Sequence, residues 1–320
     1  MNRVAVIGAG AWGTALAIQA ARAGNAVTLW VRDPARAREI ALARESPRLP
    51  GARLAEAICV AAEMPDAADA VLLAVPMQHL RAVAGLLPRA HVPLVACAKG
   101  VEQDTLRLPL EVLEELHPGR PAAVLTGPNF AREIAAGKPA ATVVAAPDPA
   151  LRARLADLLG TPGFRIYGND DPVGAQIGGA AKNVVAIAAG AVIGAGLGEN
   201  ARAGLITRGL AELGRLAVAL GGRAETVMGL SGLGDLLLTC TSAASRNFSL
   251  GLALGRGEAL GAVLAARSAV TEGVATAPAL VARAGATELP ICRAVADLLA
   301  GRLDLASAIR ALLARPRRDE

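Results

Sequence analysis

Aromatic residues are scarce in this sequence: Phe, Trp and Tyr together make up 2% of its 320 residues. Proteins that bind single-stranded nucleic acids commonly stack bases on exposed aromatic rings, so the scarcity disfavours that class of protein. The net charge of +5 is modest. We interpret a basic run near the C-terminus, Arg315–Arg318, as a solvated tail, and we expect no nucleic-acid partner.

Motifs for metal binding, disulfide bonding and hydrolysis are absent from the sequence. The four cysteines form no CxxC pair and the three histidines have no partner at metal-ligand spacing, so we expect no metal site and no disulfide framework. Neither GxSxG nor HExxH occurs, which excludes serine hydrolases of that type and zincin proteases. The N-terminus has no basic segment leading into a long apolar stretch. Together with the isolated thiols, this predicts a cytoplasmic protein.

No apolar run has the roughly twenty residues that a membrane-spanning helix needs. The most apolar stretch, residues 184–198, has about fifteen residues, and Lys182 and Glu199 bracket it. We interpret this stretch as a buried helix and expect no membrane insertion.

Short apolar runs rich in β-forming residues alternate with alanine-rich helical segments over about the first 180 residues. This alternation predicts a Rossmann-like, doubly wound parallel sheet. After residue 172 no convincing strand pattern occurs, so we expect an all-helical second half. The predicted domains are residues 1–178 and residues 179–320. The predicted strands are Val4–Ile7, Ala26–Trp30, Val71–Val75, Leu94–Cys97, Ala122–Leu125, Thr142–Ala145 and Arg165–Tyr167.

Residues typical of helix ends occur in the predicted α/β half. One helix is predicted from about Gly13 to Ala23, ending at Gly24, because glycine tolerates the left-handed conformation common after a helix. Another is predicted to begin with Asp148 as its N-cap and Pro149 at its first position.

The glycine motif Gly8-Ala9-Gly10-Ala11-Trp12-Gly13 follows the first predicted strand and opens a helix. In this context Gly8 allows a tight turn, Gly10 allows the backbone to approach a pyrophosphate, and Gly13 allows the helix to pack on the strand. The N–H groups at the start of the helix would bind the phosphates. The motif therefore predicts a dinucleotide site.

The end of the second predicted strand indicates which dinucleotide binds. Arg32 stands about twenty residues past the glycines, where NAD-binding proteins place an acidic residue for the ribose hydroxyl. An arginine there suits the 2′-phosphate of NADP. Asp33 could serve the hydroxyl of NAD, although Pro34 makes it resemble a helix N-cap. We expect NADPH as the cofactor, with NADH as the alternative.

Only three lysines, Lys99, Lys138 and Lys182, stand among 33 basic residues. Because arginine keeps its proton, a position that retains lysine is a candidate for proton transfer. Lys182 heads the predicted buried helix, where desolvation would lower its pKa and suit it to general acid–base catalysis. Lys99 follows a predicted strand at the edge where such sheets bind ligands. Lys138 is interpreted as a surface charge.

Two polar motifs interrupt the predicted helical half. Asp235 opens the apolar helix 236–240 and is interpreted first as a helix cap, with glycines nearby that would let the backbone approach a ligand. Ser245-Arg246-Asn247 follows soon after. An arginine beside these residues at a helix start suits a phosphate, and capping is the competing interpretation.

In this order the motifs resemble those of the bacterial-type NAD(P)-dependent glycerol-3-phosphate dehydrogenases. The resemblance implies a Rossmann domain followed by a helical domain like that of 6-phosphogluconate dehydrogenase. It covers almost the whole chain, through GAGAWGTALA at 8–17, AVP at 74–76, AKG at 98–100, GPNFA at 127–131, KNV at 182–184, SGLGDLLLTC at 231–240, SRN at 245–247 and TEG at 271–273.

The resemblance implies roles for individual residues. Lys182 resembles the catalytic residue, the proton acceptor from the substrate alcohol during oxidation. The residues that resemble substrate contacts are Lys99, Gly127, Asn129, Lys182, Asp235, Thr239, Ser245, Arg246 and Asn247. Those that resemble cofactor contacts are Gly8, Gly10, Ala11, Trp12, Gly13, Arg32, Lys99, Ala131, Arg246, Val270 and Glu272.

The activity implied by this resemblance is the reversible reduction of dihydroxyacetone phosphate to sn-glycerol 3-phosphate for glycerophospholipid synthesis, by a homodimer. Asn129 is a departure, since bacterial members usually carry serine there. A ketopantoate reductase-like or β-hydroxyacid dehydrogenase is the alternative enzyme, which would not need a phosphate site at Arg246. A catalytically silent NADP-binding sensor is the alternative outside enzymes.

Overall fold

The computed structural model describes residues 1–267 and 270–314. The Arg315–Arg318 run therefore lies outside the described residues. The chain divides into two compact units. The N-terminal unit comprises Met1–Lys99 and Leu108–Gln176, and the C-terminal unit comprises Gly100–Arg107 and Ile177–Glu320.

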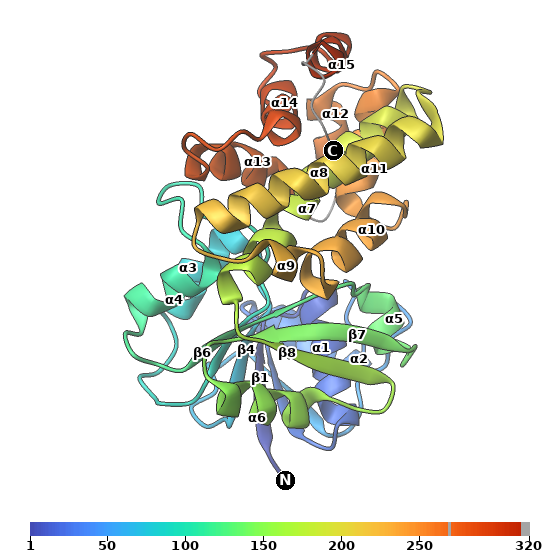
Figure 1. Cartoon of the computed structure of the whole chain (residues 1–320). Coiled ribbons are helices and arrows are strands. Elements are labelled where there is room, and N and C mark those ends of the chain that lie inside the picture. Colours follow the sequence, from blue (N-terminus) through green and yellow to red (C-terminus); the bar gives the residue numbers. More distant parts are fainter. Residues whose placement is uncertain (268–269, 315–320) are drawn as a thin grey trace. The chain divides into compact units, whose positions relative to one another are not determined.

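A sheet forms the centre of the N-terminal unit (Figure 1). It has eight strands in the order β3-β2-β1-β4-β5-β6-β7-β8. Neighbouring strands are parallel except for β6 and β7, which are antiparallel. The strands are β1 (Arg3–Ile7), β2 (Ala26–Trp30), β3 (Ile58–Ala61), β4 (Ala70–Leu73), β5 (Leu94–Ala96), β6 (Ala122–Thr126), β7 (Ala140–Ala145) and β8 (Phe164–Asn169).

Helices cover both faces of this sheet, because alternate strand residues point to opposite sides. Val4 and Val6 of β1 belong to a buried cluster with α1 (Ala11–Arg22), α2 (Pro34–Ala43) and α6 (Pro149–Leu159). Ala5 and Ile7 of the same strand belong to a second cluster with α3 (Met77–Ala84) and α4 (Pro109–Leu116). The doubly wound fold predicted from the sequence is confirmed.

All seven predicted strands are present, and the structure adds two features. The first is β3, a four-residue strand at the edge of the sheet in which only Ile58 is buried. The second is the reversed direction of β7 and of β8, which is parallel to β7. Helix α5 (Ala131–Ala135) connects β6 to β7 and is about 7.5 Å long, less than half the length of the five-residue strand β6. It is too short to return the chain to the start of β6, as a parallel connection requires.

The helix ends predicted in this unit are confirmed. Helix α1 ends at Arg22, two residues before Gly24, whose φ is +88°. The carboxylate of Asp148 accepts a hydrogen bond from the N–H of Ala150 and caps α6, which starts at Pro149.

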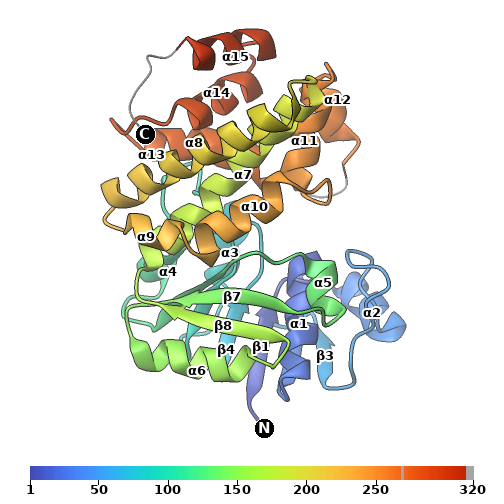
Figure 2. The ribbon, with the colours of Figure 1, turned by 45° about the vertical axis from the view of Figure 1, so that its right-hand side comes forward.

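The described part of the C-terminal unit contains helices and no strands, as the sequence predicts (Figure 2). A long helix, α7, begins at the end of the N-terminal unit and continues into this one. The elements are α7 (Pro172–Gly194), α8 (Gly198–Ala219), α9 (Ala224–Val227), the π-helical segment η1 (Leu230–Gly234), α10 (Asp235–Cys240), α11 (Arg246–Gly255), α12 (Leu260–Ala265), α13 (Glu272–Arg283), α14 (Pro290–Leu299) and α15 (Leu305–Leu313).

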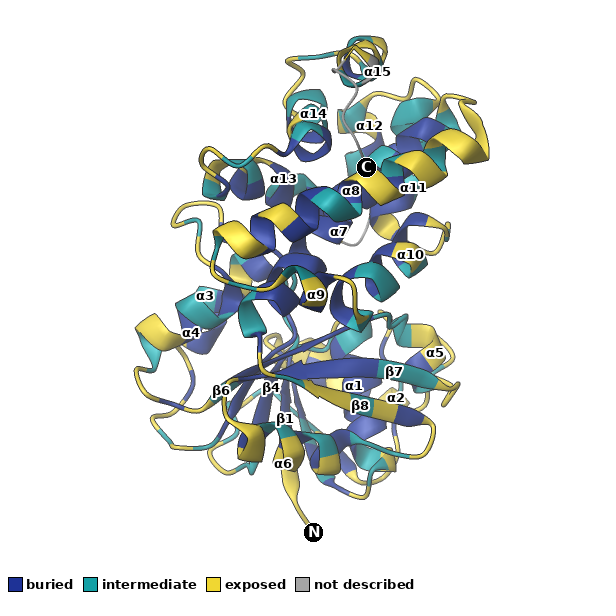
Figure 3. Ribbon diagram, in the orientation of Figure 1, coloured by how far each residue is buried: buried dark blue, intermediate teal, exposed yellow. Residues whose placement is uncertain are grey.

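Helix α7 is long and apolar enough, by length and composition, to cross a membrane, with a mean hydropathy of 1.6 in its most apolar window. However, 83% of that window is buried inside the structure (Figure 3). The core helix of a folded unit has the same pattern, and the burial supports that interpretation.

The structure corrects the predicted position of Lys182. The sequence placed it at the head of a helix of about fifteen residues, but α7 begins at Pro172 and Lys182 lies in its interior. The small residues Gly174, Gly178 and Gly179, which weakened the helical signal, are inside the helix. Tertiary packing overrides the low helix propensity of glycine here.

Glycines bring α7 and α11 into direct backbone contact. A Cβ at Gly251 would lie 1.9 Å from the carbonyl oxygen of Ile187, and one at Gly190 would lie 2.0 Å from that of Phe248. Because a side chain on either glycine would overlap the facing backbone, glycine sets the distance between these helices. Helix α7 carries Lys182 and α11 begins with Arg246.

Candidate active site

The glycine turn after β1 has the geometry that its three glycines predict. Gly8 has a φ of +110°, and a Cβ there would lie 2.8 Å from the carbonyl oxygen of Ala74. A Cβ at Gly13 would lie 1.8 Å from the carbonyl oxygen of Gly8, so α1 packs directly on the turn. A Cβ at Gly10 would meet no atom within 4 Å. The turn therefore closes on itself at Gly8 and Gly13 and is open at Gly10.

The start of α1 fits an anionic ligand. Gly10 is the N-cap and gives no side-chain cap, so the N–H groups of the first turn have no acceptor within the helix. The helix dipole adds positive charge at this end. The Nε1 of Trp12, in the same turn, is buried with no hydrogen-bond partner in the described part of the chain. A dinucleotide, with a pyrophosphate and several other acceptors, suits this set of donors.

Arg32 follows β2 and is exposed, with no hydrogen bond or ion pair to another described residue. Its guanidinium is therefore available to a ligand. The neighbouring Asp33 is engaged: its carboxylate accepts hydrogen bonds from the N–H groups of Ala35 and Arg36 and caps α2. Of the two candidates at this position, the arginine is the one left available.

Lys99 and Gly127, both predicted substrate contacts, lie together in the N-terminal unit. The Nζ of Lys99 donates a hydrogen bond of 3.2 Å to the carbonyl oxygen of Gly127. Gly127 has a φ of +150°, and a Cβ there would lie 3.1 Å from Thr142. The position thus favours glycine, and its carbonyl holds the lysine beside the end of β6.

Asn129 takes part in a hydrogen-bonded chain beside this lysine. Its Nδ2 donates to Thr142 Oγ1 over 2.9 Å, and that hydroxyl donates to the carbonyl oxygen of Thr126. The Oδ1 of Asn129 is buried with no partner among the described residues. The Nδ2 of this amide thus holds the loop in place, and its Oδ1 remains as a hydrogen-bond acceptor for a ligand. Thr142 was not among the site residues predicted from the sequence.

In the C-terminal unit, Lys182, Asp235 and Thr239 form one buried cluster. Their exposed fractions are 7%, 1% and 4%. The Nζ of Lys182 forms an ion pair with Asp235 and donates a hydrogen bond of 3.0 Å to Thr239 Oγ1. The hydroxyl of Thr239 donates in turn to the carbonyl oxygen of Asp235 over 2.6 Å.

This cluster corrects two expectations. Asp235 is the first residue of α10, with Gly234 as the N-cap, and its carboxylate pairs with Lys182 instead of capping a helix. Desolvation, the effect predicted from the sequence, disfavours the charged form of Lys182. The carboxylate beside it stabilises that charged form, so burial alone does not determine its protonation. A buried ammonium with a defined partner is a candidate proton donor.

Asn183, next to Lys182, was given no role from the sequence, yet it links α7 to two other helices. Its Oδ1 accepts a hydrogen bond of 2.8 Å from Asn247 Nδ2. The Oδ1 of Asn247 accepts one of 3.0 Å from the N–H of Gly273 in α13. The Nδ2 of Asn183 is buried with no partner among the described residues, so one hydrogen-bond donor of this amide remains unused.

The three residues Ser245, Arg246 and Asn247 divide into two kinds. Ser245 caps α11, because its Oγ accepts a hydrogen bond from the N–H of Phe248. Asn247 is buried in the link just described. Arg246 is exposed, and its Nη1 donates to the carbonyl oxygen of Val270 over 2.7 Å. Capping thus accounts for the serine, and the arginine keeps most of its donors for a ligand.

The remaining predicted cofactor residues lie at or just before helix starts. Ala131 is the first residue of α5, and Ala11 is the first residue of α1. Glu272 is the first residue of α13, two residues after Val270. Val270 is 50% exposed and receives the Arg246 hydrogen bond.

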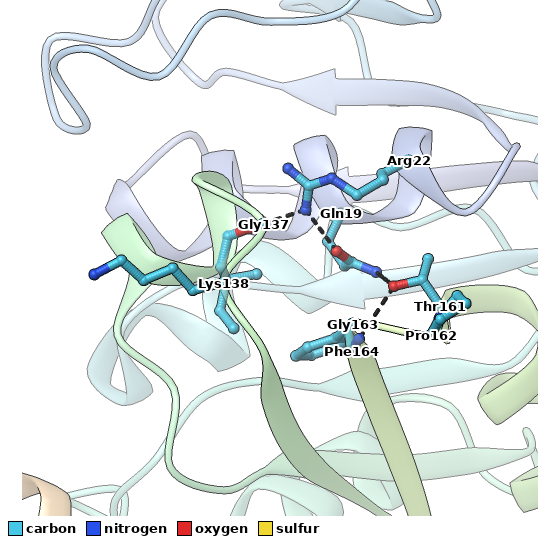
Figure 4. Close-up of a pocket in the computed structure, with 9 residues that line it drawn as sticks. Gln19, Arg22, Gly137, Lys138, Thr161, Pro162, Gly163 and Phe164 are labelled. Atoms are coloured by element: carbon cyan, nitrogen blue, oxygen red, sulfur yellow. Dashed lines mark hydrogen bonds between the residues drawn. The ribbon is translucent and has the colours of Figure 1, made fainter.

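A surface pocket of about 300 Å³ in the N-terminal unit contains none of the predicted residues (Figure 4). Arg22 donates to Gln19 and to the carbonyl oxygens of Ile134 and Ala135 at the end of α5. Gln19 donates to Thr161. Since these polar groups already bond to one another, we interpret the pocket as a structural junction between α1, α5 and β8.

Neither a metal site nor a reactive thiol is found at Cys97 or Cys240 in the described residues. No group of three or more His, Cys, Asp or Glu side chains there is arranged to hold a metal ion. Burial raises the pKa of Cys97 to about 12, and it raises that of Cys240, which is also near Asp235, to about 12. These thiols are therefore protonated and unreactive at neutral pH.

The fold and the glycine turn define a class of protein. The order β3-β2-β1-β4-β5-β6 places the turn after β1, where the strand order reverses, and this is where Rossmann-type sheets bind dinucleotides. A helical unit with a buried lysine cluster follows. These features define a dinucleotide-dependent dehydrogenase with an α/β unit and a helical unit.

Comparison with known proteins gives the family. The N-terminal model of NAD-dependent glycerol-3-phosphate dehydrogenase matches residues 3–152, and the C-terminal model matches residues 171–310. A curated glycerol-3-phosphate dehydrogenase [NAD(P)+] of Acidiphilium cryptum is 57% identical over 99% of this chain and 98% of its own length. The corresponding protein of Gluconobacter oxydans is 52% identical over 98% of this chain and 97% of its own length. The chain belongs to the NAD-dependent glycerol-3-phosphate dehydrogenase family.

A solved structure agrees with this membership. The crystal structure of glycerol-3-phosphate dehydrogenase from Coxiella burnetii has a TM-score of 0.93 and 36% sequence identity to this chain. The match covers 98% of this chain and 99% of the other. The family and fold expected from the sequence are therefore confirmed.

Proposed function

We propose that this protein catalyses the reversible reduction of dihydroxyacetone phosphate to sn-glycerol 3-phosphate with NADPH, or with NADH as the alternative, in glycerophospholipid synthesis. Membership of the family supports the reaction. The observation that carries it in this chain is the buried cluster of Lys182, Asp235 and Thr239. The cluster supplies an acid–base group, which the conversion of a ketone to an alcohol requires.

We assign the proton transfer to Lys182. A nicotinamide, when bound, supplies or accepts a hydride at C2 of the substrate. During reduction the Lys182 ammonium gives a proton to the oxygen on C2, and during oxidation the neutral amine takes it back. Asp235 stabilises the ammonium between turnovers, and Thr239 restricts the position of Nζ. Exclusion of water around these residues strengthens their electrostatic effect on the developing alkoxide.

The substrate phosphate is assigned to the start of α11. The Arg246 guanidinium supplies the charge, and Ser245 and Asn247 complete the group. Lys99 Nζ, the backbone of Gly127 and the amide of Asn129 are proposed as further substrate contacts in the N-terminal unit. Binding energy from the phosphate, remote from C2, would orient the ketone for reduction.

The cofactor is assigned to the N-terminal unit, with residues 1–178 as its binding domain and residues 179–320 as the substrate domain. The open turn at Gly10 and the N–H groups of α1 suit the pyrophosphate. Arg32 suits a 2′-phosphate, which favours NADPH. The proposed contacts are Gly8, Gly10, Ala11, Trp12, Gly13, Arg32, Lys99 and Ala131, with Arg246, Val270 and Glu272 from the C-terminal unit.

We further propose a homodimer, as expected from the family resemblance, and a cytoplasmic location, as expected from the isolated thiols and the N-terminal sequence. Gel filtration with light scattering would measure the mass in solution, and a monomer would contradict the dimer.

The reaction is tested by following the near-ultraviolet absorbance of the reduced nicotinamide with dihydroxyacetone phosphate, in parallel with NADPH and NADH. Rapid loss of absorbance with sn-glycerol 3-phosphate as product is the expected result. No oxidation with either cofactor, in protein that binds NADPH, would refute the substrate assignment. Ketopantoate would then be the next substrate to try, because it needs no phosphate site.

A further inference from the structure

Two arginines of the C-terminal unit lie against the same helix end. Arg246 is the first residue of α11, and its Nη1 donates to the carbonyl oxygen of Val270. Arg267 also binds this helix end. Its Nη1 donates to the carbonyl oxygen of Arg246 over 2.8 Å, and its Nη2 donates to Ser249 Oγ over 3.1 Å. Each arginine thus binds the chain segment that carries the other.

The two guanidinium groups repel each other without compensation from a paired carboxylate. Neither forms an ion pair with any residue in the ranges 1–267 and 270–314. Burial lowers the pKa of Arg267, and the charge of Arg246 lowers it further, against an opposing effect of Glu258. Like charges held together in this way favour binding of an anion that neutralises both.

The hydrogen-bonding capacity of the pair is only partly used. A guanidinium has five N–H donors in a planar fork. Arg246 uses one on Val270, and Arg267 reaches three oxygens, the weakest being Thr271 Oγ1 at 3.5 Å. The oxygens of a phosphate accept such forks two at a time.

We infer that Arg267 is a second guanidinium of the anion site at Arg246, and that the two together bind a phosphate monoester dianion. The identity of its natural source rests on the proposed function, where the phosphate of the substrate and the 2′-phosphate of NADPH have the same chemistry. A purely structural role for Arg267 would need only its hydrogen bonds to the oxygens of Arg246, Ser249 and Thr271. A role in anion binding also needs its positive charge.

The first experiment needs no turnover. The unfolding temperature of the full chain is measured against inorganic phosphate at constant ionic strength, for the wild type and for Arg246→Gln, Arg267→Gln and Arg267→Lys. A ligand that binds only the native state raises this temperature by an amount that grows with the logarithm of its concentration over its Kd, so a phosphate titration gives the apparent affinity. The matched control is Arg256→Gln, because Arg256 is exposed at the other end of α11 and its side chain has no partner among the described residues.

We expect Arg246→Gln and Arg267→Gln each to weaken the apparent phosphate affinity about tenfold, the loss of one charge-assisted contact. Arg267→Lys, which keeps the charge but loses the planar fork, should weaken the affinity less than Arg267→Gln does. Arg256→Gln should match the wild type. An unchanged response in Arg267→Gln, or an equal loss in Arg267→Lys and Arg267→Gln, would overturn the inference.

The second experiment identifies the source of the phosphate. If KM for dihydroxyacetone phosphate rises about tenfold in Arg267→Gln, the site takes the substrate. If KM for NADPH rises instead while KM for NADH is unchanged, the site takes the ribose phosphate, and both results support the inference. An inactive wild type that still binds phosphate through Arg267 would refute the proposed function and leave this inference intact.

Discussion

Lys182 of α7 and Asp235 of α10 are 53 positions apart in the sequence and form a buried ion pair. Removing one member of such a pair leaves the other charge buried and unpaired, at a cost of about 3–5 kcal/mol. The pair therefore has two separable contributions, one to stability and one to proton transfer. Variants that keep the charge and lose the exchangeable proton can measure them separately.

The variant Lys182→Arg should lower kcat at least about a hundredfold, because arginine keeps the pairing charge but does not exchange its proton at neutral pH. Lys182→Met should lose activity and also unfold more easily, since Asp235 is then unpaired. Steady-state rates with dihydroxyacetone phosphate and thermal unfolding measure the two effects. Lys138→Arg is the control, because the Lys138 side chain is 63% exposed. A Lys182→Arg enzyme within about tenfold of the wild-type kcat would contradict the proton-transfer role.

Arg32→Ala tests the cofactor preference. Without the guanidinium, kcat/KM with NADPH should fall about tenfold or more, the value of one charge-assisted contact, while kcat/KM with NADH should change little. The two reductions are measured in parallel on the same preparation. Arg36→Ala is the control, because Arg36 is exposed four residues further along and binds Asp33 through its backbone N–H only. Equal losses of kcat/KM with both cofactors would show that Arg32 does not bind the 2′-phosphate.

Gly251→Ala tests the contact between α7 and α11. The new Cβ would overlap the carbonyl of Ile187, so the helices must separate, and we expect a loss of about 3 kcal/mol in unfolding free energy. Asn247 lies one turn before Gly251 and bonds to Asn183, so KM for the phosphate substrate should rise as well. Denaturant unfolding and steady-state kinetics measure the two effects.

The control for this variant is Gly204→Ala on α8. A Cβ at Gly204 would meet no atom within 4 Å, and alanine favours a helix over glycine by up to about 1 kcal/mol. That variant should be as stable as the wild type or more so, with unchanged kinetics. If Gly251→Ala behaved in the same way, glycine would not set the distance between α7 and α11.

The sequence predicts local features well, and the glycine turn shows why. The positive φ of Gly8 and the contact of Gly13 with the carbonyl oxygen of Gly8 both arise within the turn, so six residues are enough to infer them. The contact of Gly8 with Ala74, which follows β4, is not local and is not evident from the motif. The caps at Asp33 and Asp148 are similarly local, because each carboxylate bonds to N–H groups within three residues.

Features that depend on distant partners were missed or misinterpreted. Asp235 resembled a helix cap because its partner lies on another helix, and the sequence alone does not show which helices meet. The rarity of lysine in the chain indicates Lys182, but its place inside α7 depends on packing that overrides the low helix propensity of glycine. Arg267 belongs to no motif, so only its bonds to Arg246 and Ser249 distinguish it from the other arginines.

Glu212 of α8 gives a prediction for pH. Its carboxylate is 1% exposed and accepts hydrogen bonds from the N–H groups of Ile291 and Cys292 at the start of α14. Burial raises the pKa of Glu212, against those two bonds, which stabilise the charged form. The native state therefore holds a proton on this carboxyl at pH values where the unfolded chain has lost it.

This difference sets the sign of the pH effect. Above the ordinary carboxyl pKa of about 4.3, the unfolded state binds fewer protons than the native state, so the contribution of Glu212 to stability falls as the pH rises. The fall is at most about 1.4 kcal/mol per pH unit and ends once the pH exceeds the raised native pKa. Glu212→Gln cannot titrate. Denaturant unfolding of both proteins from about pH 4 to about pH 8 should therefore give a free-energy difference, wild type minus variant, that decreases with pH. A difference that is constant or increases would show that Glu212 is charged in the native state throughout, with the helix start of α14 compensating its burial.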